Sequence, residues 1–118
     1  MDLIKIKDTI KANKFLIATA LQLEKDFLYI GVNLDIQKPI HDYQQLFSLA
    51  SNIVNRLNEQ DPRVIFNLLY HIDLPEEKVQ SEMKISTLTF SELLAELIVK
   101  RELQKVIMKN YYSKPENQ

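Results

Sequence analysis

The chain contains a single glycine, Gly31, among its 118 residues. Average usage of about 7% would place roughly eight glycines in a chain of this length. Glycine supplies the positive φ angles and close backbone approach that many sheet turns and phosphate-binding loops require. Its scarcity therefore favours helices joined by short turns. It also excludes Walker-type and dinucleotide-binding fingerprints, which need several glycines.

The strongest local pattern predicts one long helix over residues 89–112. Thr89 and Glu92 have the spacing of a capping box, and Leu88 and Leu93 stand at the positions of a hydrophobic staple. The apolar residues of this segment cover more than one helical face. A helix that is apolar on most sides is either central in a bundle or shared with another chain.

Periodic apolar residues predict another helix over residues 9–30. Leu16, Ala20, Leu23, Phe27 and Ile30 recur at three- and four-residue steps, which is helical spacing. An adjacent stripe of Ile10, Ile17, Leu21 and Leu28 widens the apolar face, as expected of a helix packed on more than one neighbour. Gly31 follows the last periodic residue and suits a left-handed helix end.

Capping signals predict three more helices between these two. Asp42 and Gln45 have N-cap and N3 spacing at the start of a helix that reaches about residue 59. Asp61 followed by Pro62 marks the restart of a third, short apolar helix. Acidic residues over 73–77 open a brief polar helix that ends near Met83.

We therefore expect an all-α protein, a single-domain bundle of about five helices over residues 1–112. Residues 113–118 are polar, contain Pro115 and are expected to fray. The alternative is an α+β fold with a small capping sheet. Its strands would come from the segments with β-branched or alternating character, namely Leu3–Lys7, Tyr29–Ile36 and Lys84–Phe90.

Composition excludes several classes of function. The absence of cysteine removes disulfides, thiolate metal sites and cysteine nucleophiles. The net charge of −1 gives no global attraction to nucleic acid or anionic lipid. No stretch approaches the apolar length of a membrane span, and the N-terminus offers no secretory stretch, so we expect a cytoplasmic protein.

The two histidines are the candidates for a metal-dependent enzyme. His71 precedes Asp73 by two positions, but residues i and i+2 of a helix point about 200° apart and cannot share a ligand without a break. The simpler interpretation places His71 at a helix end and His41 in a loop beside the Asp42 cap. Neither a metal-binding helix motif nor a nucleophile elbow is present. The sequence thus predicts no catalytic, cofactor-binding or metal-ligating residue.

Arg101, Lys105 and Lys109 are spaced four apart and form a basic stripe on the 89–112 helix, with Tyr112 near its end. Such a row can hold phosphates beside a stacked base, so a nucleic-acid-binding accessory protein is one alternative. Bases also collect near helix C-termini because the helix dipole favours them there. That second explanation argues against nucleic acid as a partner.

The leading hypothesis is a protein–protein interaction or structural module that forms a homodimer through the 89–112 helix. Residues 73–96 carry six acids and two lysines, a net charge of −4, and residues 100–114 carry five bases and one acid, a net charge of +4. In an antiparallel pair these segments would attract each other. The candidate interface residues are Leu94, Leu97, Ile98, Val106, Met108 and Tyr112.

Two segments, residues 67–73 (NLLYHID) and 101–107 (RELQKVI), resemble small, all-helical, uncharacterised bacterial proteins. The resemblance implies a helical fold in a bacterial protein. It implies no activity, ligand or site residue.

Overall fold

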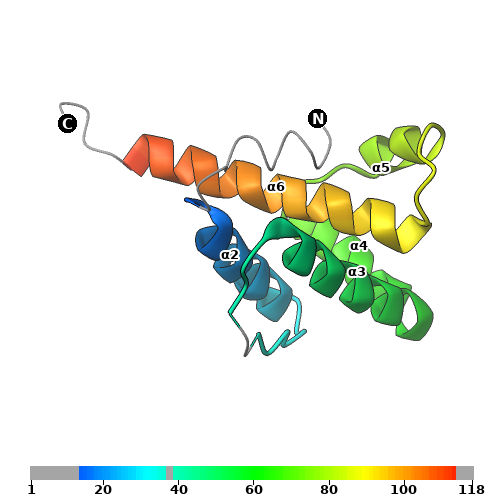
Figure 1. Ribbon diagram of the computed structural model, residues 1–118. Helices are drawn as coiled ribbons and strands as arrows, with labels where there is room; N and C mark the ends of the chain where they lie inside the picture. Colours follow the sequence, from blue (N-terminus) through cyan, green and yellow to red (C-terminus); the bar gives the residue numbers. More distant parts are fainter. Residues whose placement is uncertain (1–13, 37–38, 114–118) are drawn as a thin grey trace.

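The computed structural model describes residues 14–36 and 39–113 of the chain, and the side chains among them up to residue 111. These residues form five helices and no strand, which confirms the all-α prediction (Figure 1). The helices are α2 (Leu16–Tyr29), α3 (Tyr43–Gln60), α4 (Pro62–His71), α5 (Glu76–Met83) and α6 (Phe90–Ser113).

The α+β alternative is wrong for its two described segments. Apart from the end of α2 at Tyr29, residues 29–36 form a turn and loop, and residues 84–89 connect α5 to α6 without a strand. The third segment, Leu3–Lys7, lies outside the described residues. Residues 9–13 of the predicted 9–30 helix, which include Ile10, and the tail over residues 114–118 also lie outside the described residues. The helix is shorter than predicted at its described start, because residues 14 and 15 form a turn before Leu16.

Helix α6 is the centre of the bundle. It packs against α2, α3 and α5, and α4 packs against both α2 and α3 (Figure 1). Along α6, Leu94, Ile98 and Val99 are fully buried. Most apolar side chains of this helix are therefore buried against several neighbours within one chain, whereas Met108 and Tyr111 near its end are exposed.

Local capping signals place the helix ends as predicted. Thr89 Oγ1 accepts a hydrogen bond from the backbone N–H of Glu92 at 3.2 Å, and a Glu92 carboxylate oxygen accepts from the N–H of Thr89 at 3.0 Å. This reciprocal pair satisfies two backbone donors at the start of α6. Asp42 caps α3 by accepting from the N–H of Gln45 at 2.8 Å. Gly31 follows α2 with a φ of +88°, the predicted left-handed end.

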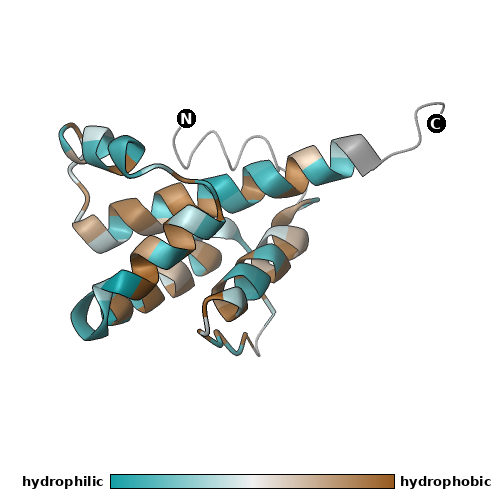
Figure 2. Ribbon diagram, turned by 180° about the vertical axis from the view of Figure 1, so that it is seen from behind, coloured by the Kyte–Doolittle hydropathy of each residue, from teal (hydrophilic) through white to brown (hydrophobic). Residues whose placement is uncertain are grey.

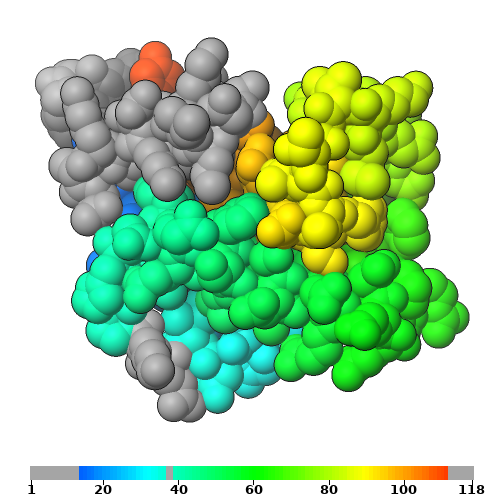
Figure 3. Space-filling model, turned by 45° about the vertical axis from the view of Figure 1, so that its right-hand side comes forward, coloured from blue at the N-terminus to red at the C-terminus, as the bar shows by residue number. Residues whose placement is uncertain are grey.

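The space-filling view shows α3 at the surface of the molecule (Figure 3). In Figure 3, α3 crosses the face of the molecule and the connection from α5 to α6 lies above it. On the ribbon, hydrophobic and hydrophilic residues alternate along each helix, as in a bundle with one buried side per outer helix (Figure 2). Among the described residues, none of the helices is long and apolar enough to cross a membrane.

Candidate functional site

A buried carboxylate on α2 ties three helices together. Asp26 has a side chain that is only 3% exposed, and Lys105 Nζ of α6 donates to its Oδ2 at 2.6 Å. Gln22 Nε2 donates to the same oxygen at 3.1 Å. His71 Nε2, at the end of α4, lies 3.1 Å from Oδ1 and donates in the tautomer that protonates this nitrogen. We call these four side chains the Asp26 cluster.

Glu102 is a second acid beside the cluster and is fully buried. Its Oε1 lies 3.6 Å from Lys105 Nζ. Burial and the neighbouring Asp26 raise the pKa of Glu102 to about 9, against the opposing effect of Lys105. Neither carboxylate oxygen of Glu102 accepts a hydrogen bond from a described residue. Once protonated, the group becomes a donor to Asp26, which makes the neutral form the one that fits.

The pKa values of the two acids shift in opposite directions within the same buried site. Burial acts to raise the pKa of Asp26, but hydrogen bonds with Glu102, Lys105 and Gln22, together with the charge of Lys105, lower it overall. Near neutral pH the buried group therefore holds an ionised Asp26 and a protonated Glu102. This leaves one negative charge against the Lys105 ammonium, the balance that a buried site requires.

The neighbouring polar contacts also serve packing. Arg101 Nε donates to the backbone carbonyl of Ile72 at 2.7 Å, and its guanidinium lies 3.9 Å from Asp73. The ring of Tyr29 stacks on His71 with centroids 3.8 Å apart. These contacts join the end of α4 to α2 and α6, so the polar residues at this junction fix the relative positions of the helices.

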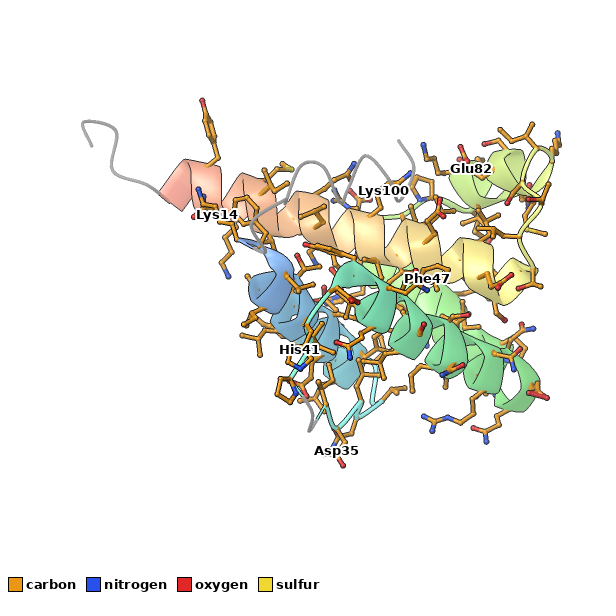
Figure 4. All side chains as sticks on the ribbon, viewed as in Figure 1. Lys14, Asp35, His41, Phe47, Glu82 and Lys100 are labelled. Carbon is orange, nitrogen blue, oxygen red and sulfur yellow. The ribbon has the colours of Figure 1, made fainter. Side chains whose placement is uncertain are left out.

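A carboxylate bonded to histidine can serve as a general base. Here, however, neither Asp26 nor His71 lines either of the two hollows described below. His41 lies on the exposed loop before α3 (Figure 4), where its backbone N–H is bonded to the side chain of Gln45. Across residues 14–36 and 39–113, no group of three or more His, Cys, Asp or Glu side chains is placed to hold a metal ion.

The opposite face of α2 carries large apolar side chains in solvent. Ile17, Leu21 and Leu28 are 64%, 59% and 60% exposed. Their spacing of four and seven residues puts them on one side of the helix. We call these three residues the α2 stripe. The sequence pattern predicted that a neighbouring helix would cover it, but no described element does.

Two hollows flank the α2 stripe, and Leu21 lines both of them. On one side is a hollow of about 190 Å³, the loop hollow, which is bordered by Glu24 and by apolar residues of the 36–40 loop. On the other side, between α2 and the second half of α6, is a hollow of about 520 Å³, the lysine hollow. It is lined by Lys14, Phe15, Ala18, Leu21, Gln22, Lys25, Val106, Lys109 and Asn110. Figure 4 shows Lys14 beside the second half of α6.

The predicted interface residues of α6 occupy different places. Leu94, Leu97, Ile98 and Val106 lie in the core of the single chain. Met108 is 51% exposed, whereas the side chain of Tyr112 lies outside the described residues. Most of the side chains offered for a dimer through α6 are thus already packed within the chain.

The predicted basic stripe divides in the same way. Arg101 and Lys105 are partly buried in the contacts with Ile72, Asp73 and Asp26 described above. Lys109 alone of the three is exposed, and it lines the lysine hollow. The cations that line the lysine hollow are therefore Lys109 of α6, Lys25 of α2 and Lys14 of the turn before α2.

Sequence reasoning did not select Asp26 or Glu102. A signal was present, because Asp26 adjoins Phe27 on the apolar face of α2, and Glu102 adjoins Leu103 in the same way on α6. An acid among core positions needs a partner. The identity of that partner depends on how the helices pack.

In the comparisons with known proteins, no family model, no curated protein and no solved structure matches this chain.

Proposed function

We propose that this protein is a protein–protein interaction module that binds its partner through the solvent face of α2. The observation that carries the proposal is the α2 stripe, three large aliphatic side chains exposed in one row. Contiguous apolar patches of this kind on a monomer mark interaction sites more often than isolated exposed residues do. The cytoplasmic location predicted from the sequence is kept as part of the proposal.

The surroundings of the α2 stripe support a site for a helix. The Leu21 side chain lies between the loop hollow and the lysine hollow and lines both of them. A helix packs on another by placing its side chains in the grooves beside a row of protruding side chains, and the α2 stripe with its two hollows offers such a surface. The Asp26 cluster holds α2 from behind, so the exposed face sits on a fixed support and loses little conformational freedom on binding.

The test compares two exposed hydrophobic residues in different places. Leu21→Lys alters the α2 stripe, whereas Ile85→Lys alters an isoleucine that is 78% exposed on the α5–α6 connection. We expect Leu21→Lys, and not Ile85→Lys, to abolish association, both in sedimentation of the purified protein and in co-purification from cells. Circular dichroism would verify that both variants keep the wild-type helix content. Partners or oligomers that survive Leu21→Lys unchanged would refute the proposal.

A second candidate, nucleic-acid binding, is favoured by one observation. Lys14, Lys25 and Lys109 converge on one hollow that also contains the Phe15 ring. Lysines neutralise phosphates and an aromatic ring can stack a base, and such binding weakens steeply as salt rises. The double variant Lys25→Glu/Lys109→Glu should then lose affinity for single-stranded nucleic acid at low salt. Equal affinity of variant and wild type would remove this candidate.

A further inference from the structure

The proposed function leaves the occupant of the α2 stripe open, and the charges beside the stripe narrow the choice. Glu24 lies on the side of the loop hollow, and Lys25 lies on the side of the lysine hollow. Lys14, the other cation of the described α2 region, lies on the same side as Lys25. The stripe is thus bordered by an acid on one side and by bases on the other.

This arrangement is complementary to itself in one orientation. When two identical helices pair in parallel about a two-fold axis, the left border of one meets the right border of the other. Glu24 of each copy then faces Lys25 of the other, one residue apart along the axis, a rise of about 1.5 Å. In an antiparallel pair, borders on the same side meet, so the acid would face the acid border and the lysines would face lysines.

The apolar residues fit the same pairing. Ile17, Leu21 and Leu28 are separated by four and seven residues, spacings that also occur in the seam of a two-stranded coiled coil. In a parallel pair, Leu21 meets Leu21 and Leu28 meets Leu28 of the second copy.

Resting on the proposed function, we infer that the α2 stripe binds the α2 stripe of a second copy of this chain. The two helices run parallel, with Glu24 of each copy paired to Lys25 of the other. The homodimer predicted from the sequence is thereby placed on α2 and not on α6. Ile36, Pro39 and Ile40 of the loop hollow extend the apolar area beside each helix.

Cysteine cross-linking tests the pairing directly because the chain has no cysteine of its own. In a parallel pair, the two cysteines of Leu21→Cys lie at the same level along the helix axes and face each other. A disulfide needs their Cβ atoms about 3.5–4.5 Å apart, which close packing of the two helices at this level would allow. We expect mild oxidation to convert Leu21→Cys to a covalent dimer, and Ile85→Cys to remain monomeric. Absence of the Leu21 cross-link in a folded variant would overturn the inference. So would a cross-link that forms only when Leu21→Cys is mixed with Leu28→Cys.

Charge exchange tests the ion pairs. Lys25→Glu alone should weaken the dimer about tenfold by sedimentation equilibrium, because it places acid against acid twice. The double variant Glu24→Lys/Lys25→Glu should recover most of that loss, since opposite charges face each other again. Glu24 also accepts a hydrogen bond from the N–H of Ile36 at 3.4 Å. Glu24→Gln keeps an acceptor oxygen for that bond but removes the charge, so its effect on dimer affinity reports the ion pair. Failure of the double variant to recover affinity would contradict the pairing.

The two proposals fail in different ways. A wild-type chain that stays monomeric at high micromolar concentration, yet captures another protein in a Leu21-dependent manner, overturns the self-pairing and leaves the proposed function standing. A dimer that is unaffected by both Leu21→Lys and Lys25→Glu overturns both.

Discussion

Lys105 donates a hydrogen bond of 2.6 Å to Asp26 across 79 positions of sequence. The pair joins α2 to α6, and His71 on the other carboxylate oxygen adds α4. A buried ion pair contributes little net stability when it is complete, but its disruption is costly because one charge remains buried without its partner. The Asp26 cluster is therefore the place where a single substitution should loosen the attachment of α2.

Asp26→Asn should destabilise the fold by about 3 kcal/mol, because Lys105 loses its anionic partner in a site that is closed to most solvent. The free energy of unfolding in urea measures the change. Arg63→Ala is the matched control, since it removes an ion pair with Asp61 in which the arginine is 89% exposed. That pair should contribute less than about 1 kcal/mol. Equal losses in the two variants would contradict the role of burial.

Glu102→Gln should stabilise the protein at neutral pH. The pKa of Glu102 is raised by burial from 4.5 to about 9, so the folded state keeps a proton that the unfolded state releases. The stability that comes with this proton is complete below pH 4.5 and is lost progressively as the pH rises toward 9. By pH 7 the loss amounts to about 3 kcal/mol.

Glutamine has the shape of the protonated acid and does not ionise, so the variant avoids that loss. Urea unfolding between pH 4.5 and 8.5 should show the two proteins equal at the acidic end and increasingly different above it. The pKa of Asp26 is lowered from its ordinary value of 3.8, so Asp26 stays ionised over this pH range in the wild type and its titration does not produce the difference. Parallel pH profiles would show that Glu102 is not the group responsible.

Gly31→Ala should cost about 1 kcal/mol. The φ of +88° is a conformation that residues with a Cβ adopt only with strain, whereas a Cβ at this position would meet no atom within 4 Å. The cost is therefore a backbone cost, without a steric clash. Thermal unfolding should show a lower midpoint for Gly31→Ala and a smaller decrease for Gly31→Asn, because asparagine tolerates left-handed geometry. A larger decrease for asparagine would point to a clash instead.

The helix ends were predictable because their causes are local. Thr89 is bonded to a residue three positions away, and Asp42 caps α3 over the same distance. The left-handed conformation of Gly31 is likewise required by the backbone of its own turn. Each of these interactions needs only residues that are close in the sequence, so the types and spacing of those residues predict it.

The surroundings of the candidate-site residues depend on packing between distant segments. Leu94 and Leu21 are both leucines in periodic helical patterns, yet the first is in the core and the second is 59% exposed. Periodicity groups residues on a face but does not say which face another helix will cover. For the same reason the sequence does not reveal the Lys105–Asp26 pair, and its spacing predicts a single basic surface of Arg101, Lys105 and Lys109.

The different surroundings of Lys105, which is partly buried, and Lys109, which is exposed, can be tested. Lys105→Gln should destabilise the protein by about 3 kcal/mol because Asp26 would keep its buried charge without the ammonium. Lys109→Gln should change the free energy of unfolding by less than about 0.5 kcal/mol, since Lys109 is exposed. Combining Asp26→Asn with Lys105→Gln should cost less than the sum of the single losses, because the second substitution removes a partner that is already lost. A double-mutant cycle should give a coupling of about 1 to 3 kcal/mol. Strict additivity would show that the 2.6 Å contact does not join α2 to α6 in solution.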